Sequence, residues 1–280
     1  MFRLRGARIL ITGASSGIGA ATAVAFAHRH ARLALCARRL DRLQAIADQC
    51  RHAGAQEVVV KRADVGRPDD ARAFVGTALQ ELGQIDALVN NAAVGWRGPF
   101  VAMGDREVQE LVQTNLLGYI WVTRAALPSM LEAESGVVVN VCSVVGLRAV
   151  PYGAVYSATK YAITGMSHAL RGELSGTGVK ISTVYPGTTS TDFQGRRAGG
   201  RFTQTPERVA RTVVRAVRWP RRDVVAFPYR LAAFAEPFFG GLMDHAVGEV
   251  QRHQDQPPLP PREPPLGEER RGDEPPPRVR

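Results

Sequence analysis

The feature that most constrains the fold of this chain is a regular alternation between short β-rich runs and longer helical segments. The short runs are rich in Val, Ile, Leu and Ala, whereas the segments between them are rich in Ala, Leu, Arg and Glu at helical spacing. Strands that alternate with helices indicate a parallel sheet covered on both faces. The run GVVVNV at 136–141 is apolar apart from one Asn, which is typical of a strand buried on both faces. We therefore predict an α/β fold, a doubly wound parallel sheet of about seven strands with helices on both faces.

The same patterns place the expected elements along the chain. The strands are expected at Arg8–Thr12, Leu33–Ala37, Glu57–Arg62, Ile85–Asn90, Val137–Ser143, Lys180–Tyr185 and Val224–Pro228. Helices are expected at Ala20–Arg29, Leu40–His52, Asp69–Leu82, Arg106–Glu132 and Ala154–Leu174, with a further helix after Thr205.

The composition changes near residue 250. Over the whole chain, 45% of residues are hydrophobic and 22% are charged, which is ordinary for a globular protein. The last thirty residues, in contrast, hold nine of the eighteen prolines, together with six arginines and six acids that cancel. Such a segment cannot bury enough apolar surface to fold. We predict a single domain over 1–250, with a substrate lid at about 188–205, and a disordered Pro/Arg-rich tail over 251–280.

The formal net charge of +10 is carried mostly by arginine. A basic protein can bind nucleic acid or an acidic surface. The sequence shows no basic stripe interleaved with several aromatic residues, as single-strand binding requires. We therefore expect the arginines to be spread over solvated faces, some of them facing a phosphorylated cofactor, and we expect no nucleic acid partner.

The three cysteines are scattered, with neither metal-ligand spacing nor a disulfide framework, which fits a reducing compartment. We expect no metal site. The first apolar run begins at Ile9 and leads directly into a glycine loop, which leaves no room for a signal peptide. No run of about 18 uninterrupted apolar residues exists, so we expect a cytoplasmic protein without a transmembrane segment. Weak membrane association of the aromatic run 227–243 is left open.

A glycine-rich turn follows the first expected strand. The stretch ITGASSGIGAATA at 11–23 has the glycine pattern GxxxGxG, which is neither GxGxxG nor a phosphate-binding P-loop. Gly13 allows the tight turn, Gly17 lets the backbone approach a pyrophosphate, and Gly19 lets helix and strand pack closely. The free N–H groups of the following helix favour an anion. We predict a Rossmann-type dinucleotide site that also uses Ser15, Ser16 and Ile18; a plain strand-to-helix turn is the alternative.

Cofactor choice depends on the residues after the second expected strand. NAD-binding sheets usually carry an acid there, whereas NADP-binding sheets carry an Arg for the 2′-phosphate. Here the strand ends at Ala37 and is followed by Arg38 and Arg39, with no acid before Asp41. The pattern favours NADP(H), with Arg38 as the phosphate ligand, while NAD(H) remains possible.

Three polar residues are expected to meet at the carboxyl edge of the sheet. In YSATK, Tyr156 and Lys160 are four residues apart and so share one helix face. Ser143 ends an expected strand, where ligands of open parallel sheets bind. A free phenol has a pKa near 10, and a neighbouring ammonium favours the phenolate, so we expect a lowered pKa for Tyr156. Tyr156 would then act as general acid/base on a carbonyl or alcohol oxygen that Ser143 also binds.

The chain resembles the short-chain dehydrogenase/reductase family over nearly all of residues 5–230. The matching stretches are TGASSGIG (12–19), NNAA (90–93), Asn115 in QTNLLG, Ser143, YSATK (156–160) and PGTTST (186–191), which are highly specific together. One departure is Ala93, because NNAG is the commoner form of the NNAA stretch.

The resemblance implies a role for each matching position. Asn115 would interrupt its helix and hold a water that links Lys160 to bulk solvent, and Lys160 would bind the nicotinamide ribose and depress the Tyr156 pKa. The remaining implied cofactor contacts are Asp64 and Val65 at the adenine, Asn91 behind the cofactor, and Pro186, Gly187 and Thr191 at the nicotinamide amide and phosphates. The family also implies a homodimer or homotetramer that pairs the helices around 106–132 and 154–174.

These inferences combine into one predicted function with two alternatives. We predict an NADP(H)-dependent oxidoreductase, a carbonyl reductase or alcohol dehydrogenase, with catalytic residues Asn115, Ser143, Tyr156 and Lys160. The alternatives are a catalytically idle NADP-binding regulator, and an isomerase or dehydratase on the same scaffold. The loops at 95–100, 144–153 and 188–205 would select the small-molecule substrate, which the sequence does not identify.

Overall fold

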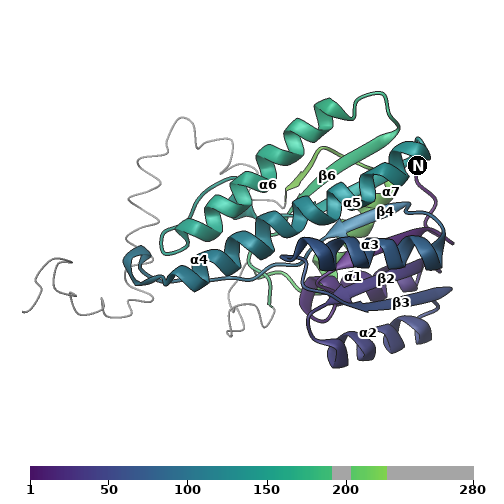
Figure 1. The fold of residues 1–280 in the computed structure, drawn as a ribbon, viewed down its shortest axis with the longest axis horizontal. Helices are drawn as coiled ribbons and strands as arrows, with labels where there is room; N and C mark the ends of the chain where they lie inside the picture. The colour runs from purple at the N-terminus through teal and green to yellow at the C-terminus, as the bar shows by residue number, and fades with distance from the viewer. Residues whose placement is uncertain (191–202, 226–280) are drawn as a thin grey trace, which may run out of the picture.

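The computed structural model describes residues 1–190 and 203–225, which form a seven-stranded sheet with helices on both faces (Figure 1). Every strand pair is parallel, and the strand order is β3-β2-β1-β4-β5-β6-β7. The strands are β1 (Arg8–Thr12), β2 (Arg32–Ala37), β3 (Glu57–Arg62), β4 (Ala87–Asn90), β5 (Gly136–Val141), β6 (Val179–Tyr185) and β7 (Asp223–Val225). The predicted doubly wound Rossmann-type fold is confirmed.

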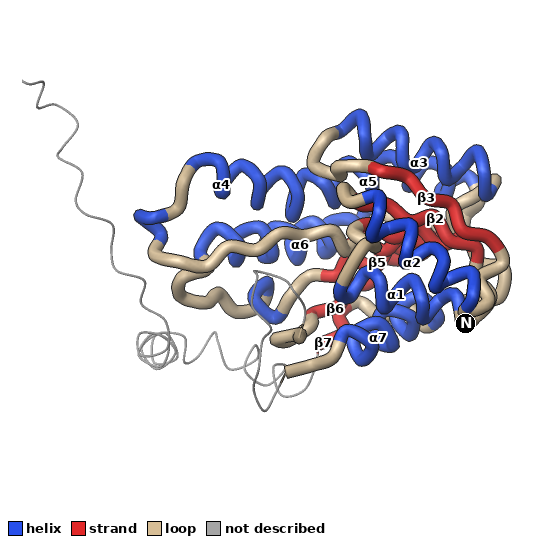
Figure 2. The backbone as a smooth tube through the Cα atoms, turned by 90° about the horizontal axis from the view of Figure 1, so that it is seen from below, coloured by secondary structure: helices blue, strands red, loops and turns tan. Residues whose placement is uncertain are grey.

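The helices divide between the two faces of the sheet. Figure 2 shows α1, α2 and α7 on one side of the strands and α3 and α5 on the other. The helix bounds are α1 (Gly17–Ala27), α2 (Leu40–His52), α3 (Pro68–Leu82), α4 (Asp105–Val112), α5 (Gly118–Glu132), α6 (Ala154–Glu173) and α7 (Pro206–Arg218). Short helical turns add η1 (Phe100–Ala102), η2 (Gln113–Leu117) and η3 (Val144–Gly146).

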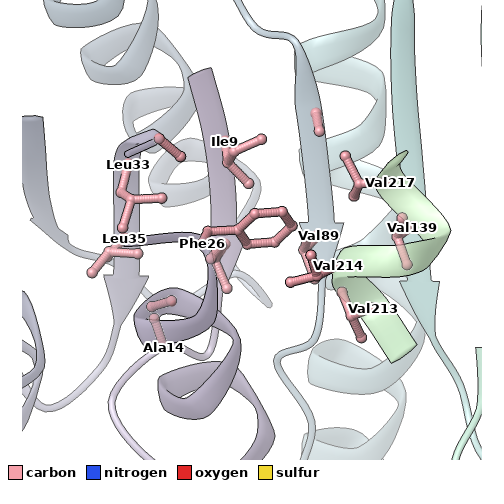
Figure 3. Close-up of a cluster of buried hydrophobic side chains, with 14 of the residues drawn as sticks. Ile9, Ala14, Phe26, Leu33, Leu35, Val89, Val139, Val213, Val214 and Val217 are labelled. Atoms are coloured by element: carbon pink, nitrogen blue, oxygen red, sulfur yellow. The ribbon is translucent and has the colours of Figure 1, made fainter. Parts of the chain in front are cut away.

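The strands contribute apolar side chains to the cores on both faces of the sheet, because successive side chains of a strand point to opposite faces. On β1, Ile9 and Ile11 pack into the layer of α1, α2 and α7, whereas Leu10 packs into the layer of α3 and α5. Phe26 of α1 lies at the centre of the first layer, beside Val214 of α7 (Figure 3). All six residues of β5 are buried, as its continuous apolar run predicted. The sheet is thus a rigid, two-sided platform for the residues at its carboxyl edge.

Several predicted boundaries differ from the structure. The helix expected over 106–132 is interrupted, since η2 is a π-helical segment between α4 and α5. Helix α1 begins at Gly17 rather than Ala20, because the glycine turn leads into it without a spacer. β5 ends at Val141, so Ser143 lies two residues beyond the strand, as the N-cap of η3. β4 begins at Ala87 rather than Ile85.

Three predicted regions fall partly or wholly outside the described residues. The lid at 188–205 is described at 188–190 and 203–205, where Thr189 and Gln204 form an isolated parallel bridge. The tail at 251–280 and the end of the strand expected at 224–228 lie outside. Within 1–190 and 203–225, no helix is both long enough and apolar enough to span a bilayer.

Candidate active site

The candidate site lies where the strand order reverses, between β1 and β4. Ligands of open α/β sheets bind outside the carboxyl ends of the strands at such a switch point. The glycine turn follows β1, Asn91 follows β4, Ser143 follows β5 and Pro186 follows β6. The topology therefore brings to one edge residues as distant in sequence as Gly13 and Pro186.

The glycine turn, residues 13–19, has no room for side chains at two of its glycines. Gly13 has a positive φ of 66°, and a Cβ added there would lie 2.7 Å from Cα of Ala92. A Cβ on Gly19 would collide with the carbonyl oxygen of Gly13. The Asn91 side chain holds the turn, since its Nδ2 donates to the carbonyl oxygens of Thr12 at 3.0 Å and Gly13 at 3.2 Å. Asn91 thus supports the turn directly, and its place behind a cofactor stays a prediction.

The start of helix α1 is open to an anion. Ser16 is the residue before the first helical turn, yet its side chain makes no capping hydrogen bond, and the first turn carries no acid. A cation lies beside it: Arg39 Nη2 donates to Ser16 Oγ at 3.0 Å and to Ser15 Oγ at 3.4 Å. A glycine turn with uncapped N–H groups and an adjacent guanidinium fits a dinucleotide phosphate. Sequence reasoning named Arg38 and missed Arg39, although the two are adjacent.

A hollow of about 410 Å³ lies beyond the ends of β2 and β3. It is lined by Arg38, Arg62, Ala63, Asp64, Arg67 and Asp70. Arg38 Nη1 pairs with Glu110 Oε1 of α4 at 2.8 Å, and both side chains are about half exposed. Asp64 Oδ1 accepts from the N–H of Gly66 at 3.0 Å, which shapes the loop after β3. Val65 is buried against Gly118 of α5 and is not among the residues that line the hollow.

Ser143 and Tyr156 meet at the carboxyl edge. Ser143 Oγ accepts from the N–H of Val145 at 3.2 Å, which caps η3 and fixes the Ser143 side chain. The same side chain hydrogen-bonds the side chain of Tyr156 on the first turn of α6. The two hydroxyls that were predicted to share a substrate oxygen therefore lie together.

Lys160 lies one helical turn further along α6 and is almost completely buried, at 1% exposure. Its Nζ lies 5.6 Å from the centre of the Tyr156 ring and 5.3 Å from the centre of the Tyr119 ring. Tyr119 is buried too, and its hydroxyl donates to the carbonyl oxygen of Val141 at 2.8 Å. The ammonium is thus held between two aromatic rings. Sequence reasoning missed Tyr119, although its position four residues after Asn115 puts the two on one helix face.

Burial controls the proton affinities of this group. Burial raises the pKa of the Tyr156 phenol, the Cys142 thiol acts in the same direction, and the hydrogen bond with Ser143 opposes them. Burial also lowers the pKa of Lys160 below its ordinary value. The prediction of a lowered Tyr156 pKa is therefore wrong for the protein chain alone. Removing both groups from water disfavours their charged forms more than the neighbouring charge favours them.

Asn115 sits inside η2 and is fully buried. Its Oδ1 accepts from the N–H of Val94 and its Nδ2 donates to the carbonyl oxygen of Val94, both at 2.8 Å. The side chain therefore ties the helix interruption to the loop after β4. Both polar atoms of the Asn115 side chain are already hydrogen-bonded to Val94. The predicted proton path at Asn115 would therefore have to pass through a main-chain atom of this residue.

A buried polar ladder crosses the sheet behind the catalytic edge. Asn90 Nδ2 donates to Thr123 Oγ1 of α5 at 2.8 Å and to Asn140 Oδ1 of β5 at 2.9 Å. Asn140 Nδ2 in turn donates to Ser167 Oγ of α6 at 2.9 Å. The ladder fixes α5 and α6 relative to β4 and β5, and sequence reasoning did not identify it. The single Asn within the apolar run of β5 could have indicated the ladder, since a buried side-chain amide requires hydrogen-bond partners.

The remaining predicted contacts are partly described. Pro186 is buried and Gly187 half-buried at the end of β6, on the same edge as Ser143. The carbonyl oxygen of Pro186 accepts from the N–H of Val144 at 3.0 Å, which joins the loops after β5 and β6. Thr191 lies outside the described residues. Ile18 is half-buried in the first turn of α1.

Two of the three expected substrate loops touch. The N–H of Gly98 donates to the carbonyl oxygen of Tyr152 at 2.9 Å. Tyr152 holds a positive φ of 61°, which is unusual for a residue with a side chain. This hydrogen bond therefore joins the loops at 95–100 and 144–153.

Comparisons with known proteins agree with this geometry. The family model for short chain dehydrogenases matches residues 7–200. An uncharacterized oxidoreductase of Listeria innocua is 34% identical over 243 residues, which cover 82% of this chain and 97% of that protein.

Two solved structures show the same fold. An alcohol dehydrogenase from the archaeon Thermococcus sibiricus, complexed with 5-hydroxy-NADP, is similar with a TM-score of 0.72 and 30% identity, covering 78% of this chain and 94% of its own. A short chain dehydrogenase/reductase from Burkholderia phymatum, in complex with NAD, is similar with a TM-score of 0.77 and 25% identity, covering 94% and 100%.

Proposed function

This chain belongs to the short chain dehydrogenase family, and from that premise we propose that it is an NADP(H)-dependent oxidoreductase that interconverts a carbonyl compound and a secondary alcohol. The observation that carries the proposal is the meeting of Ser143 and Tyr156 at the carboxyl edge, with the ammonium of Lys160 buried beneath the phenol ring. Each residue type alone is common, but this combination beside an open glycine turn suits proton transfer at a substrate oxygen.

The chain's own residues would transfer the proton and hydrogen-bond the substrate oxygen. When bound, the nicotinamide would supply the hydride for the carbonyl carbon. Tyr156 would donate its phenolic proton to the carbonyl oxygen during reduction and accept a proton during oxidation. Ser143 is held by Val145 and would donate a hydrogen bond to the same oxygen, which orients it and stabilises its developing negative charge.

The raised Tyr156 pKa bears on the direction of catalysis. A protonated phenol is the form needed to reduce a carbonyl, and burial preserves that form. Oxidation of an alcohol needs the phenolate, which must be favoured by positive charge brought close to the ring. Lys160 provides one such charge from within the chain, in its protonated form, and it is near enough to interact with the ring.

Two arginines support the preference for NADP(H). Arg39 lies against the glycine turn with part of its guanidinium unused by Ser15 and Ser16. Arg38 lines the hollow beyond β2 but is paired with Glu110. We therefore assign the 2′-phosphate mainly to Arg39, with Arg38 as a second ligand that must first leave Glu110.

The proposal includes a cytoplasmic homodimer or homotetramer. The three cysteines are free and buried, which fits a reducing compartment. Leu131 of α5 and Tyr161 of α6 are 39% and 41% exposed, and these helices are the ones expected to pair between subunits.

A panel of carbonyl and alcohol substrates, followed at the nicotinamide absorbance with NADPH and NADH in parallel, tests the proposal. We expect turnover of at least one carbonyl substrate, with a higher kcat/KM for NADPH than for NADH. Binding of NADPH without turnover across the panel would favour the idle regulator, and conversion of substrate without net cofactor consumption would favour an isomerase or dehydratase.

A further inference from the structure

Helix α7 presents a continuous row of arginines to solvent. Arg208, Arg211 and Arg215 follow each other at spacings of three and four residues, which puts them on one face, and all three are exposed. The opposite face is occupied by the core, where Val213 and Val217 pack against the sheet (Figure 3). The sequence predicts arginines spread over solvated faces, whereas the fold gathers these three on one face of α7.

The row continues beyond the end of the helix. The guanidinium of Arg218 lies 4.4 Å from the ring centre of Trp219, whose side chain is 44% exposed. Arg221 and Arg222 follow, and both are exposed. We call the arginines of residues 208–222 together with Trp219 the basic stripe. From Arg208 to Arg218 it extends for about 15 Å along the helix axis.

The N-terminus of the chain extends the same surface. The N–H of Phe2 donates to the carbonyl oxygen of Arg218 at 2.9 Å, so the first residues lie beside the end of α7. Met1 is 81% exposed, and Arg3 and Arg5 are exposed as well. The thioether of Met1 lies 3.9 Å from Nη2 of Arg218, so an exposed apolar side chain borders the stripe, and two further cations follow within the next four residues of the chain.

The charge of the basic stripe is not compensated. Some arginines elsewhere pair with acids, for example Arg32 with Glu57 and Arg51 with Asp48. Within 1–190 and 203–225, no carboxylate lies at ion-pair distance from any arginine of the stripe. Two acids flank the stripe in sequence: Glu207, exposed in the first turn of α7, forms no ion pair among the described residues, and Asp223 pairs with Arg171.

We propose that the basic stripe docks this protein on the surface of a bilayer that contains anionic phospholipids. Clusters of arginine are attracted to the negative surface of such bilayers, and each added Arg strengthens partitioning about fivefold. Tryptophan favours the interface between headgroups and acyl chains, which suits the half-exposed ring of Trp219 at one end of the stripe. The docking would be peripheral, because the apolar face of α7 stays packed on the sheet.

Other partners fit this surface less well. Helix α7 lies flat on the sheet and cannot enter a major groove, and a single aromatic residue offers no series of platforms for unstacked bases. A second copy would bring two uncompensated positive stripes together, which is repulsive. The sequence that follows β7, at 226–243, includes four Phe and a Tyr among mostly apolar residues, which favours a lipid surface over a nucleic acid.

The placement is compatible with the proposed catalysis and independent of it. Helix α7 lies on the face of the sheet opposite α5 (Figure 2), so docking would leave the helices expected to pair between subunits uncovered. Its first turn follows Gln204, which pairs with Thr189 just after β6. One end of the basic stripe therefore lies near the catalytic edge.

Vesicle co-sedimentation of the full-length protein tests the proposal. The vesicles are phosphatidylcholine with and without phosphatidylserine, at physiological salt. One variant carries Arg208→Gln, Arg211→Gln and Arg215→Gln. The matched control carries Arg42→Gln, Arg72→Gln and Arg106→Gln, three exposed arginines elsewhere, so that both variants lose the same charge.

We expect the protein to bind the vesicles that contain phosphatidylserine and not those of phosphatidylcholine alone. The partition coefficient should fall at least tenfold in the stripe variant and less than twofold in the control. Equal losses in the two variants, or no binding by the unmodified protein, would overturn the proposal. So would tighter binding to single-stranded DNA than to the vesicles at the same salt. If the stripe variant does not fold, release of the unmodified protein from vesicles by raised salt decides instead, since electrostatic docking must weaken.

Discussion

The glycine turn at 13–19 and the proposed catalytic group of Ser143, Tyr156 and Lys160 lie at the same edge of the sheet but depend on different physics. In the glycine turn, the proposed function requires side chains to be absent: Gly13 and Gly19 leave no space for a Cβ, and the proposed anion site would consist of main-chain N–H groups. In the proposed catalytic group, function would require particular side chains, and burial sets their proton affinities. The first region should therefore be sensitive to added volume, and the second to lost chemistry.

This difference predicts separable defects. A change in the catalytic group should reduce turnover while fold and cofactor binding persist. A change in the glycine turn should weaken fold and cofactor binding together, because the turn is also the junction of β1, α1 and the loop after β4.

The largest effect is expected from Tyr156→Phe. Removing the phenolic hydroxyl abolishes the proposed proton transfer, which is typically worth about 10²- to 10⁴-fold in rate. We expect kcat to fall by that factor while the dissociation constant for NADPH, measured by fluorescence quenching, changes less than threefold. Turnover close to that of the unmodified protein would show that another group supplies the proton.

Gly19→Ala should give the next largest effect, on stability. The added methyl would collide with the Gly13 carbonyl oxygen, and overpacking of this kind costs about 1–3 kcal/mol. Gly76→Ala in α3 is the matched control, because a Cβ there meets nothing within 4 Å and alanine favours a helix interior by about 0.5–1 kcal/mol. Thermal unfolding should show a lower midpoint for Gly19→Ala and an equal or higher one for Gly76→Ala. Equal midpoints for the two variants would contradict the close packing of the turn.

Cofactor choice should depend more on Arg39 than on Arg38. We expect Arg39→Ala to weaken NADPH binding about tenfold, as the loss of one charge-assisted phosphate contact would, and to leave NADH binding nearly unchanged. Arg38→Ala should have a smaller effect, because Arg38 is shared with Glu110. Titration of each variant with both cofactors measures the ratio of the NADPH and NADH dissociation constants. A larger loss of NADPH affinity in Arg38→Ala than in Arg39→Ala would restore Arg38 as the phosphate ligand predicted from the sequence.

The proton affinity of Tyr156 can be tested by pH. Because burial raises its pKa, the phenol should remain protonated at pH 10, where a free tyrosine is about half ionised. The near-ultraviolet difference between the unmodified protein and Tyr156→Phe, followed as pH rises, isolates this one phenolate. A midpoint at or below pH 10 without cofactor would show that Lys160 outweighs burial.

The smallest effect is expected from removing residues 254–280. A Pro-rich, charge-balanced segment contributes little apolar burial, so the thermal midpoint of the shortened chain should stay unchanged. A clear decrease would show that the tail stabilises the domain.

The sequence was sufficient for the architecture because period and composition report burial directly. β1, α2 and β3 lie within the predicted bounds, since each has sharp limits in apolar pattern. It was also sufficient to bring Ser143 and Tyr156 to one edge, because parallel topology fixes where strand ends lie. The π-helical segment at Asn115 could be expected only from the family resemblance, because no propensity favours it.

Environment was the part that sequence could not supply. The sign of the Tyr156 pKa shift depends on how deeply the phenol is buried, and four-residue spacing from Lys160 says nothing about depth. The choice between Arg38 and Arg39 as phosphate ligand depends on the direction of each side chain. Arg38 is hydrogen-bonded to Glu110, which lies 72 positions away in the sequence. The basic stripe emerges only when helix α7 buries its apolar face.

The central claim, reduction by a hydride from NADPH with a proton from Tyr156, is tested most directly by mass spectrometry of the product formed with NADPH deuterated at C4. Once the panel has identified a carbonyl substrate, we predict one deuterium at the carbinol carbon per molecule of alcohol and one NADP⁺ formed alongside it. Tyr156→Phe should bind the same cofactor and form almost no such product. A converted substrate without deuterium, beside unconsumed cofactor, would contradict the account.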